Sequence, residues 1–175
     1  MLFWRPFFHR GVSYDLSHLH PSFIKFIQPG NANQPERLYK VNVSYSVHCF
    51  SRKDDSAEPS LSYSDIRETR TFDFVRYELS KRLPEIIGGL HTRKCLHSGK
   101  GNFFVIETIA PDGDSRDYEV YFKVSKAETA GIINLYVQSA YIRDIHHKNR
   151  PINKKIGFFV ILHNKLVGKE IKIPK

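Results

Sequence analysis

The residues best suited to chemistry lie in one glycine-bounded connection, which reads GGLHTRKCLHSGKG over residues 88–101. Imidazole titrates near neutral pH and can act as a general base or a general acid, while Arg and Lys can stabilise a phosphorane. Cleavage of RNA without a metal ion needs this combination of groups. The alternative is a basic loop that contacts phosphates, or nothing, without chemistry. The candidate residues are His91, Arg93, Lys94, His97 and Lys100.

A second candidate cluster ends an apolar segment, LYVQSAYIRD over residues 135–144. Simple strand alternation places Ser139 and Tyr141 on the same face as Leu135 and Val137, so the core side becomes polar where the strand leaves the core. Hydroxyl groups there can bond a phosphate oxygen, and Arg143 can supply charge. The alternative is that both hydroxyl groups bond local backbone at a strand end.

The charge of the chain indicates a polyanionic partner. The 175 residues carry a formal net charge of +9, with nine basic and two acidic residues in the stretch 143–175. Neutralising phosphates releases counterions, so such a stretch favours nucleic acid binding. Lys148 and Arg150 are expected to contribute to it. The alternative is a charged surface that serves solubility alone.

Several classes are disfavoured by what the sequence lacks. It contains no GxxxxGK[ST], GxGxxG, HExxH, GxSxG or paired CxxC motif, and its nine histidines have no supporting metal-ligand spacing. We therefore expect no metal and no cofactor. No apolar run is long enough to cross a bilayer, the N-terminus lacks the apolar region of a signal peptide, and the two cysteines cannot form a disulfide framework. These features favour a cytoplasmic protein.

Around these clusters the patterning predicts one domain over residues 1–175, with an irregular aromatic N-terminal region 1–38 and an α+β core 39–175. The expected architecture is an antiparallel meander sheet with an N-terminal-half helix packed on one face. The helix has apolar residues at positions 72, 75, 79, 83, 86 and 90, and Pro84 should kink it or start a second helix. The expected strands are 39–50, 102–109, 118–124, 132–142 and 156–163, with a short last strand near Ile171.

The N-terminus is unusually aromatic. Phe3, Trp4, Phe7 and Phe8 are too apolar to be left exposed together, so they either cap the core or form a contact patch. A contact patch would fit a protein partner such as an antitoxin.

The element order and two motifs bear a likeness to a known fold. A helix, a His-bearing connection, a hairpin with the strand YEVYF (118–122) and a strand ending VQSAY (137–141) resemble the barnase–EndoU–colicin–RelE type of ribonuclease fold. The stretch VQSAYIRD is also similar to short bacterial proteins of stationary-phase or stress adaptation. The likeness covers roughly residues 70–163. It implies that His91 is the base and that Ser139 and Tyr141 line the cleft.

The leading hypothesis is a bacterial, cytoplasmic endoribonuclease of toxin or stress-response type that needs no metal. In it His91 takes the 2′-proton, His97 or Tyr141 assists the leaving group, and cations hold phosphate. One rival is a non-catalytic module that binds nucleic acid through the same basic face. Another is a partner protein of a toxin–antitoxin or phage-defence system that uses the aromatic N-terminus. The phosphate-holding residues would be Arg93, Lys94, Lys100 and Arg143.

Overall fold

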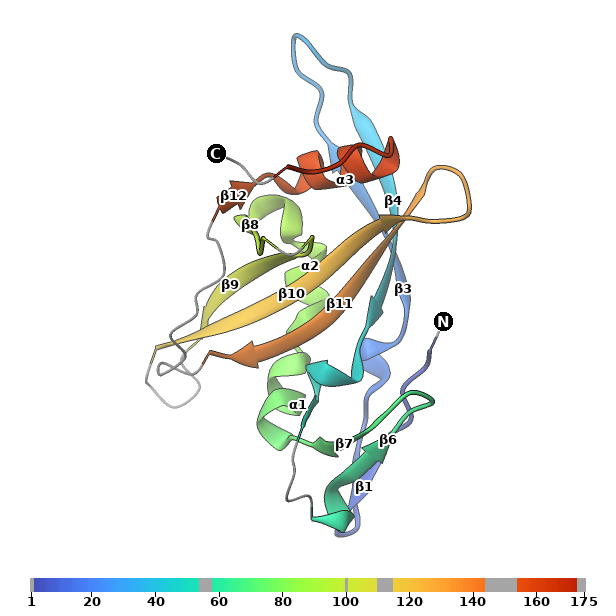
Figure 1. Cartoon of the computed structure of the whole chain (residues 1–175), viewed down its shortest axis with the longest axis vertical. Helices are drawn as coiled ribbons and strands as arrows, with labels where there is room; N and C mark the ends of the chain where they lie inside the picture. Colours follow the sequence, from blue (N-terminus) through green and yellow to red (C-terminus); the bar gives the residue numbers. More distant parts are fainter. Residues whose placement is uncertain (1, 54–57, 100, 110–114, 144–153, 173–175) are drawn as a thin grey trace.

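A seven-stranded mixed sheet organises the molecule (Figure 1). A computed structural model describes residues 2–53, 58–99, 101–109, 115–143 and 154–172. The strand order is β12-β8-β9-β10-β11-β4-β3. These strands span Ser22–Gln28 (β3), Arg37–Tyr45 (β4), Cys95–His97 (β8), Phe103–Ile109 (β9), Arg116–Lys126 (β10), Ile132–Ile142 (β11) and Lys154–Ile156 (β12).

The centre of this sheet is the expected meander. β9 pairs with β10 and β10 with β11, all antiparallel, so the predicted hairpin is confirmed; its predicted turn at 111–114 lies outside the described residues. The sheet is mostly antiparallel, as predicted, and in addition β11 pairs in parallel with β4. A parallel neighbour needs a long crossover, and here the helical segments and the whole hairpin lie between the two strands. The predicted α+β class is confirmed.

The predicted helix 72–90 is two short helices, α1 (Phe74–Ser80) and α2 (Leu83–Gly88). Pro84 stands in the first turn of α2, where a missing N–H is harmless, so it begins a second helix as one of the two expected outcomes. Asp73 caps α1 by accepting a hydrogen bond from the Arg76 amide. The predicted inward position of Val75 is wrong, because its side chain is 61% exposed and Tyr77 is buried instead.

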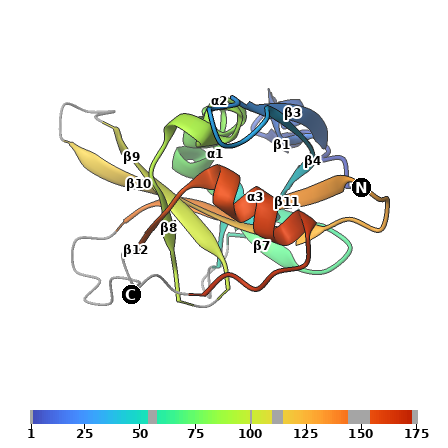
Figure 2. The ribbon, with the colours of Figure 1, turned by 90° about the horizontal axis from the view of Figure 1, so that it is seen from above.

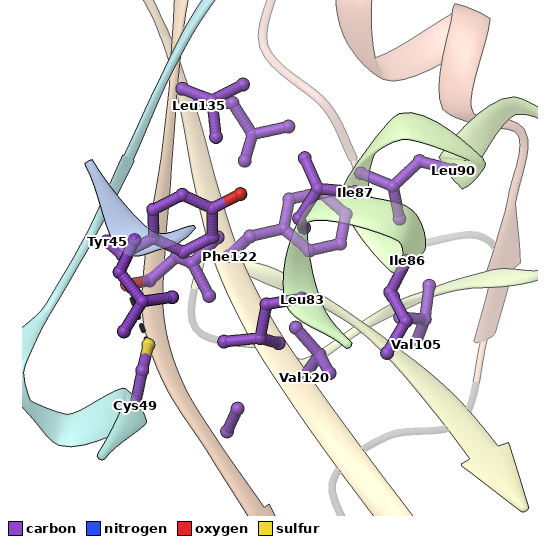
Figure 3. Packing of buried hydrophobic residues seen from close by; sticks show 14 of the residues in the cluster. Tyr45, Cys49, Leu83, Ile86, Ile87, Leu90, Val105, Val120, Phe122 and Leu135 are labelled. Carbon is purple, nitrogen blue, oxygen red and sulfur yellow. Dashed lines mark hydrogen bonds between the residues drawn. The ribbon is translucent and has the colours of Figure 1, made fainter. Parts of the chain in front are cut away.

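The core lies between α2 and the inner face of the sheet (Figure 3). In Figure 3 Leu83 and Ile87 extend from α2 toward Val120 and Phe122 of β10, and Ile86 lies beside Val105 of β9. In Figure 1 α1 and α2 lie behind β10 and β11, which leaves the opposite face of these strands without a covering helix. The uncovered face is called the outer face below. Because only the opposite face of these strands is covered by helices, polar side chains can gather on the outer face.

The C-terminal segment differs from the prediction. The expected strand 156–163 is mostly a helix, α3 (Phe158–Leu166), preceded by the three-residue strand β12; no strand forms at Ile171. A short apolar run such as FFVIL is compatible with a strand or with a buried helix. The buried positions Phe158, Ile161 and Leu162 have helical spacing, and α3 packs across β10 and β11 at the end of the sheet seen from above in Figure 2.

The predicted strand 39–50 is shorter than expected. β4 ends at Tyr45, and a 3₁₀ turn over Val47–Cys49 (η2) follows it. The side chain of Ser46 accepts a hydrogen bond from the His48 amide and so favours the turn over continued strand. Further 3₁₀ turns cover Ser17–Leu19 (η1), Pro59–Leu61 (η3) and Leu90–Thr92 (η4).

The N-terminal region is more regular than predicted and contributes to the core. It forms the two-stranded sheet β1-β2 and the strand β3 of the large sheet, and Phe7 of β1 packs against Tyr63 and Phe72 of a three-stranded sheet, β5-β7-β6. Trp4 and Phe7 are buried, whereas Phe3 and Phe8 are more than 60% exposed, so the aromatic segment is divided between core and surface. The remaining strands are Phe7–His9 (β1), Val12–Tyr14 (β2), Ser51–Arg52 (β5), Ser62–Ser64 (β6) and Thr69–Phe72 (β7).

Candidate functional site

A β-bulge in β11 decides where the predicted site residues point. Tyr121 pairs with Ser139, but the next residue, Phe122, pairs with Val137, so Gln138 is the extra residue. The prediction that Ser139 shares a face with Val137 is therefore wrong, because the bulge reverses the alternation. Val137 and Ala140 are fully buried, and Ser139 and Tyr141 lie on the outer face.

On the outer face, two adjoining hollows form one groove, called the outer groove below, whose second hollow is lined mainly by polar side chains. Ser46, Glu68 and Tyr136 line both hollows, whose volumes are about 460 Å³ and 410 Å³. The first hollow is also lined by Leu2, Trp4, Asn42, Val43, Ser44, Tyr45, Val47, Asp65, Arg67 and Asn134. The second is also lined by His48, Asn102, Tyr121, Gln138, Ser139 and Tyr141. The two predicted hydroxyl residues, Ser139 and Tyr141, thus do line one cleft.

An aromatic column forms one wall of this groove. Phe104, Tyr121 and Tyr141 stack across β9, β10 and β11, with ring centroids 5.1 Å and 5.7 Å apart and nearly parallel planes. The guanidinium carbon of Arg76 lies 5.5 Å from the Tyr141 centroid. The Tyr141 ring therefore has two partners already.

The side chains of His48 and Glu68 contact each other in the groove, and this pair is called the dyad below. The Nε2 atom of His48 lies 2.7 Å from Oε1 of Glu68, and both side chains are more than one-third exposed. Partial burial opposes ionisation of Glu68, but hydrogen bonds from His48 and Arg70 hold its pKa below the usual value. A carboxylate that orients an exposed imidazole is an arrangement suited to general base chemistry.

Beside the dyad, a buried ion pair anchors the column. Arg143 donates to the carboxylate of Glu119 over 2.6 Å, and the Tyr121 hydroxyl donates to the same carboxylate over 2.7 Å. Burial and this hydrogen bond raise the pKa of Tyr121. The Arg143 side chain is only 10% exposed, so the structure gives this predicted phosphate ligand an internal role.

Two amide pairs border the groove. Asn42 Nδ2 donates to Asn134 Oδ1 over 3.2 Å at one end, and Asn102 Nδ2 donates to Gln138 Oε1 over 2.8 Å at the other. Ser98 in turn donates to the Asn102 side chain. This chain of hydrogen bonds connects the bulge in β11 with the loop that follows β8.

The expected convergence of His91 with Ser139 and Tyr141 is not what the structure shows. His91 lies exposed in η4, where its ring contacts Phe26 of β3 and Phe159 of α3, and it does not line the outer groove. The η4 turn follows α2, on the covered side of the sheet, whereas the bulge sends Ser139 to the outer face. His91 is thus separated from the cleft hydroxyl groups by the sheet itself.

The remaining residues of the first cluster have different surroundings. His97 is buried in β8, and burial, with a contribution from Lys165, lowers its pKa. Arg93 pairs with Glu107 over 2.6 Å, so its charge is engaged internally. Lys94 is exposed. Lys100, Lys148 and Arg150 lie outside the described residues.

Lysines flank β8, occupy β12 and lie at and after the end of α3, and this set is called the basic surface below. Lys154 is the cross-strand partner of His97, and Lys165 of α3 is close enough to influence the His97 pKa. Glu170 is the one carboxylate among the described residues 154–172. The basic surface comprises Lys94, Lys154, Lys155, Lys165, Lys169 and Lys172.

Metal and thiol chemistry find little support in the described part of the chain. No group of three or more His, Cys, Asp or Glu side chains there could hold a metal ion. Cys49 and Cys95 are free and buried, and burial raises the pKa of each thiol to about 12, so both are protonated and unreactive at neutral pH. Among the described residues no helix is long and apolar enough to span a membrane.

Sequence reasoning missed His48 as a site residue, as well as Glu68, Tyr136 and Gln138. His48 was recognisable as a polar-face residue of an amphipathic strand. Nothing in the sequence pairs it with Glu68, which lies twenty residues away in the turn between β6 and β7. Tyr136 and Gln138 lie within the segment that was singled out. Their exposure depends on the face of β11 and on the bulge.

Together, the fold and the groove define an α+β protein with a polar cleft on the uncovered face of a mixed sheet. The model of the YjaZ family matches residues 6–166, and the chain belongs to that family. No curated protein and no solved structure matches the chain significantly. The likeness to the ribonuclease fold stays a prediction.

Proposed function

We propose that the chain is an RNA-binding protein whose basic surface holds the phosphate backbone. The observation that supports this proposal best is the set of lysines on β12, at the end of α3 and in the segment that follows α3. Lys154, Lys155 and Lys169 are exposed, and no described carboxylate pairs with them. Unpaired cations on adjoining elements attract phosphates and release counterions when they bind.

The arrangement of paired and unpaired cations supports the same assignment. Arg93 and Arg143 serve internal ion pairs, whereas the lysines of the basic surface other than the half-buried Lys165 are exposed. A Lys ammonium group on a flexible stem binds phosphate as a point charge without demanding a fixed geometry. Contacts of this kind give affinity for RNA with little base preference.

The test is binding of a labelled single-stranded RNA, measured by fluorescence anisotropy over a series of salt concentrations. The logarithm of affinity should fall with the logarithm of salt by about 0.7 per phosphate contact. Replacing Lys154 and Lys155 by Glu should weaken binding and reduce this slope by about 1.4 or more.

The control is a variant with the same charge change at the other end of the sheet. Lys25 and Lys40 are exposed cross-strand partners on β3 and β4, so their replacement by Glu alters net charge equally. If both double variants weaken binding to the same extent, the basic surface is not the binding site. If the wild-type protein binds no RNA even at low salt, RNA binding itself is wrong.

A second candidate function is RNA cleavage without a metal ion, in a toxin or stress-response setting in the bacterial cytoplasm. The observation that favours it is the His48–Glu68 dyad, which lines the same hollow as the hydroxyl groups of Ser139 and Tyr141. His48 would take the 2′-proton in place of His91, while Tyr141 would assist the leaving oxygen. A protein partner such as an antitoxin would contact the exposed rings of Phe3 and Phe8.

A further inference from the structure

We propose that the outer groove binds an unpaired base of single-stranded RNA, with Tyr136 as the stacking platform. This inference rests on the proposed RNA binding and names the form of RNA that the protein takes. Three observations support it: the Tyr136 ring has no stacking partner among the described residues, carboxylates line the groove, and two amide pairs border it.

Tyr136 is the aromatic residue of the groove whose ring is available. It lies between the two hollows, lines both, and is neither fully buried nor fully exposed. Within the described residues no ring stacks on it and its hydroxyl group has no hydrogen-bond partner. Tyr121 and Tyr141, in contrast, already stack on each other, and Trp4 packs against Phe50. A ring held on a strand with a free face is the platform on which single-stranded nucleic acid bases stack.

The charges that line the groove exclude phosphate from its interior. Asp65 and Glu68 line the groove together with one fixed cation, Arg67. Glu68 is also paired with His48 and with Arg70, which does not line the groove. A phosphate group would be repelled by these carboxylates, whereas an uncharged base would not. The part of a nucleotide suited to the groove is therefore its base.

A cation for the phosphate stands next to the platform, outside the groove. Lys123 of β10 is exposed and is the cross-strand partner of Tyr136, so the two side chains lie on the same face. Cross-strand partners have Cβ atoms about 5 Å apart. At this spacing one nucleotide can place its base on the Tyr136 ring and its phosphate on the Lys123 ammonium group.

The amide pairs lie where base edges would reach. Asn42 with Asn134, and Asn102 with Gln138, border the two hollows on either side of Tyr136. Amide groups can both donate to and accept from base edges. In duplex RNA the bases are stacked and paired inside the helix, so only an unpaired base can enter between these groups.

The experiment compares one RNA sequence as a single strand and as a blunt duplex, using three variants. Tyr136→Leu keeps an apolar side chain but removes the aromatic face, Tyr136→Phe keeps the face, and Phe8→Ala removes an exposed ring outside the groove. We expect Tyr136→Leu to weaken single-strand binding about fivefold to 150-fold, the range that loss of one stacked base gives. Tyr136→Phe and Phe8→Ala should bind as the wild type does, and the duplex should bind more weakly.

Occupation of the groove has an independent readout. Trp4 is the one tryptophan of the chain and lines the groove, so its fluorescence should change when the single strand binds and not when the duplex binds. Circular dichroism and a urea titration establish that each variant is folded.

Two failures are distinguishable. If Tyr136→Leu binds the single strand as tightly as wild type while the Lys154 and Lys155 double variant binds weakly, the groove is not the base site and the proposed function stands. If wild type and every variant fail to bind either form at low salt, the proposed function and this inference are both wrong. Equal affinity for duplex and single strand also overturns the inference.

Discussion

The guanidinium of Arg143 and the carboxylate of Glu119 form a buried ion pair of 2.6 Å that ties the end of β11 to β10 beside the outer groove. The Glu119 side chain is only 2% exposed and also accepts the Tyr121 hydroxyl. The pair therefore stabilises the polar end of the sheet and positions the aromatic column, a role that a phosphate ligand could not fill.

Replacement of Arg143 by Met should destabilise the protein by about 3–5 kcal/mol, because it leaves the Glu119 carboxylate buried without its cation. Adding Glu119→Gln to that variant should recover part of the loss, because the buried charge is then absent as well. The free energy of unfolding from urea titrations checks both values. As a control, Lys81→Met breaks the exposed pair with Glu78 and should cost no more than about 1 kcal/mol.

Leu83→Ala should cost about 2–5 kcal/mol, because Leu83 is fully buried between α2 and the sheet and its truncation leaves a cavity (Figure 3). Val75→Ala on the neighbouring helix should change stability by no more than about 0.5 kcal/mol, because the Val75 side chain is 61% exposed. Chemical denaturation of both variants measures the difference. Equal losses would show that the helix faces are assigned wrongly.

If the protein cleaves RNA, His48→Ala should lower the rate roughly a hundred- to ten-thousandfold, because it removes the positioned general base. Affinity for RNA should hardly change, since a neutral imidazole adds little to phosphate binding. His91→Ala is the matched control, because His91 is exposed and does not line the groove. Cleavage is followed on a labelled RNA in the presence of EDTA. A larger loss from His91→Ala than from His48→Ala would restore the hypothesis drawn from sequence.

Two histidines should make the protein less stable below neutral pH. Burial lowers the pKa of His97, with Lys165 contributing, and burial also lowers the pKa of His18, which contacts Ser80 over 2.8 Å. Each folded-state pKa is below the unfolded value of about 6.5, so the unfolded chain takes up protons first as the pH falls. The free energy of unfolding should therefore be highest above pH 6.5 and fall between about pH 6.5 and 5.

Urea titrations at intervals from pH 8 to 5 measure this decline. His97→Gln should reduce the slope in that interval, because glutamine takes up no proton. An unchanged slope in this variant would show that His97 does not contribute, and a rise in stability toward pH 5 would contradict the prediction for both histidines.

Local sequence was sufficient to predict the elements that have a strong hydrophobic period and clear turn or helix-breaking residues at their ends. The strand 132–142 has the predicted bounds, and the hairpin before it follows from alternation around a Pro-Asp-Gly turn signal. The break between α1 and α2 follows from Pro84, whose ring and missing N–H act on its own turn. These features depend on interactions within a few residues, which a sequence displays directly.

The site depended on tertiary structure. The extra residue Gln138 reverses the face of Ser139 and Tyr141, and the sheet then separates them from His91. Pairing of β11 with β4 brings Asn134 beside Asn42, and the turn between β6 and β7 brings Glu68 to His48. Residue types and net charge determined which chemistry the chain could support. Strand register and long-range pairing decided which of those residues meet, because a shift of one residue in a strand turns every later side chain to the other face.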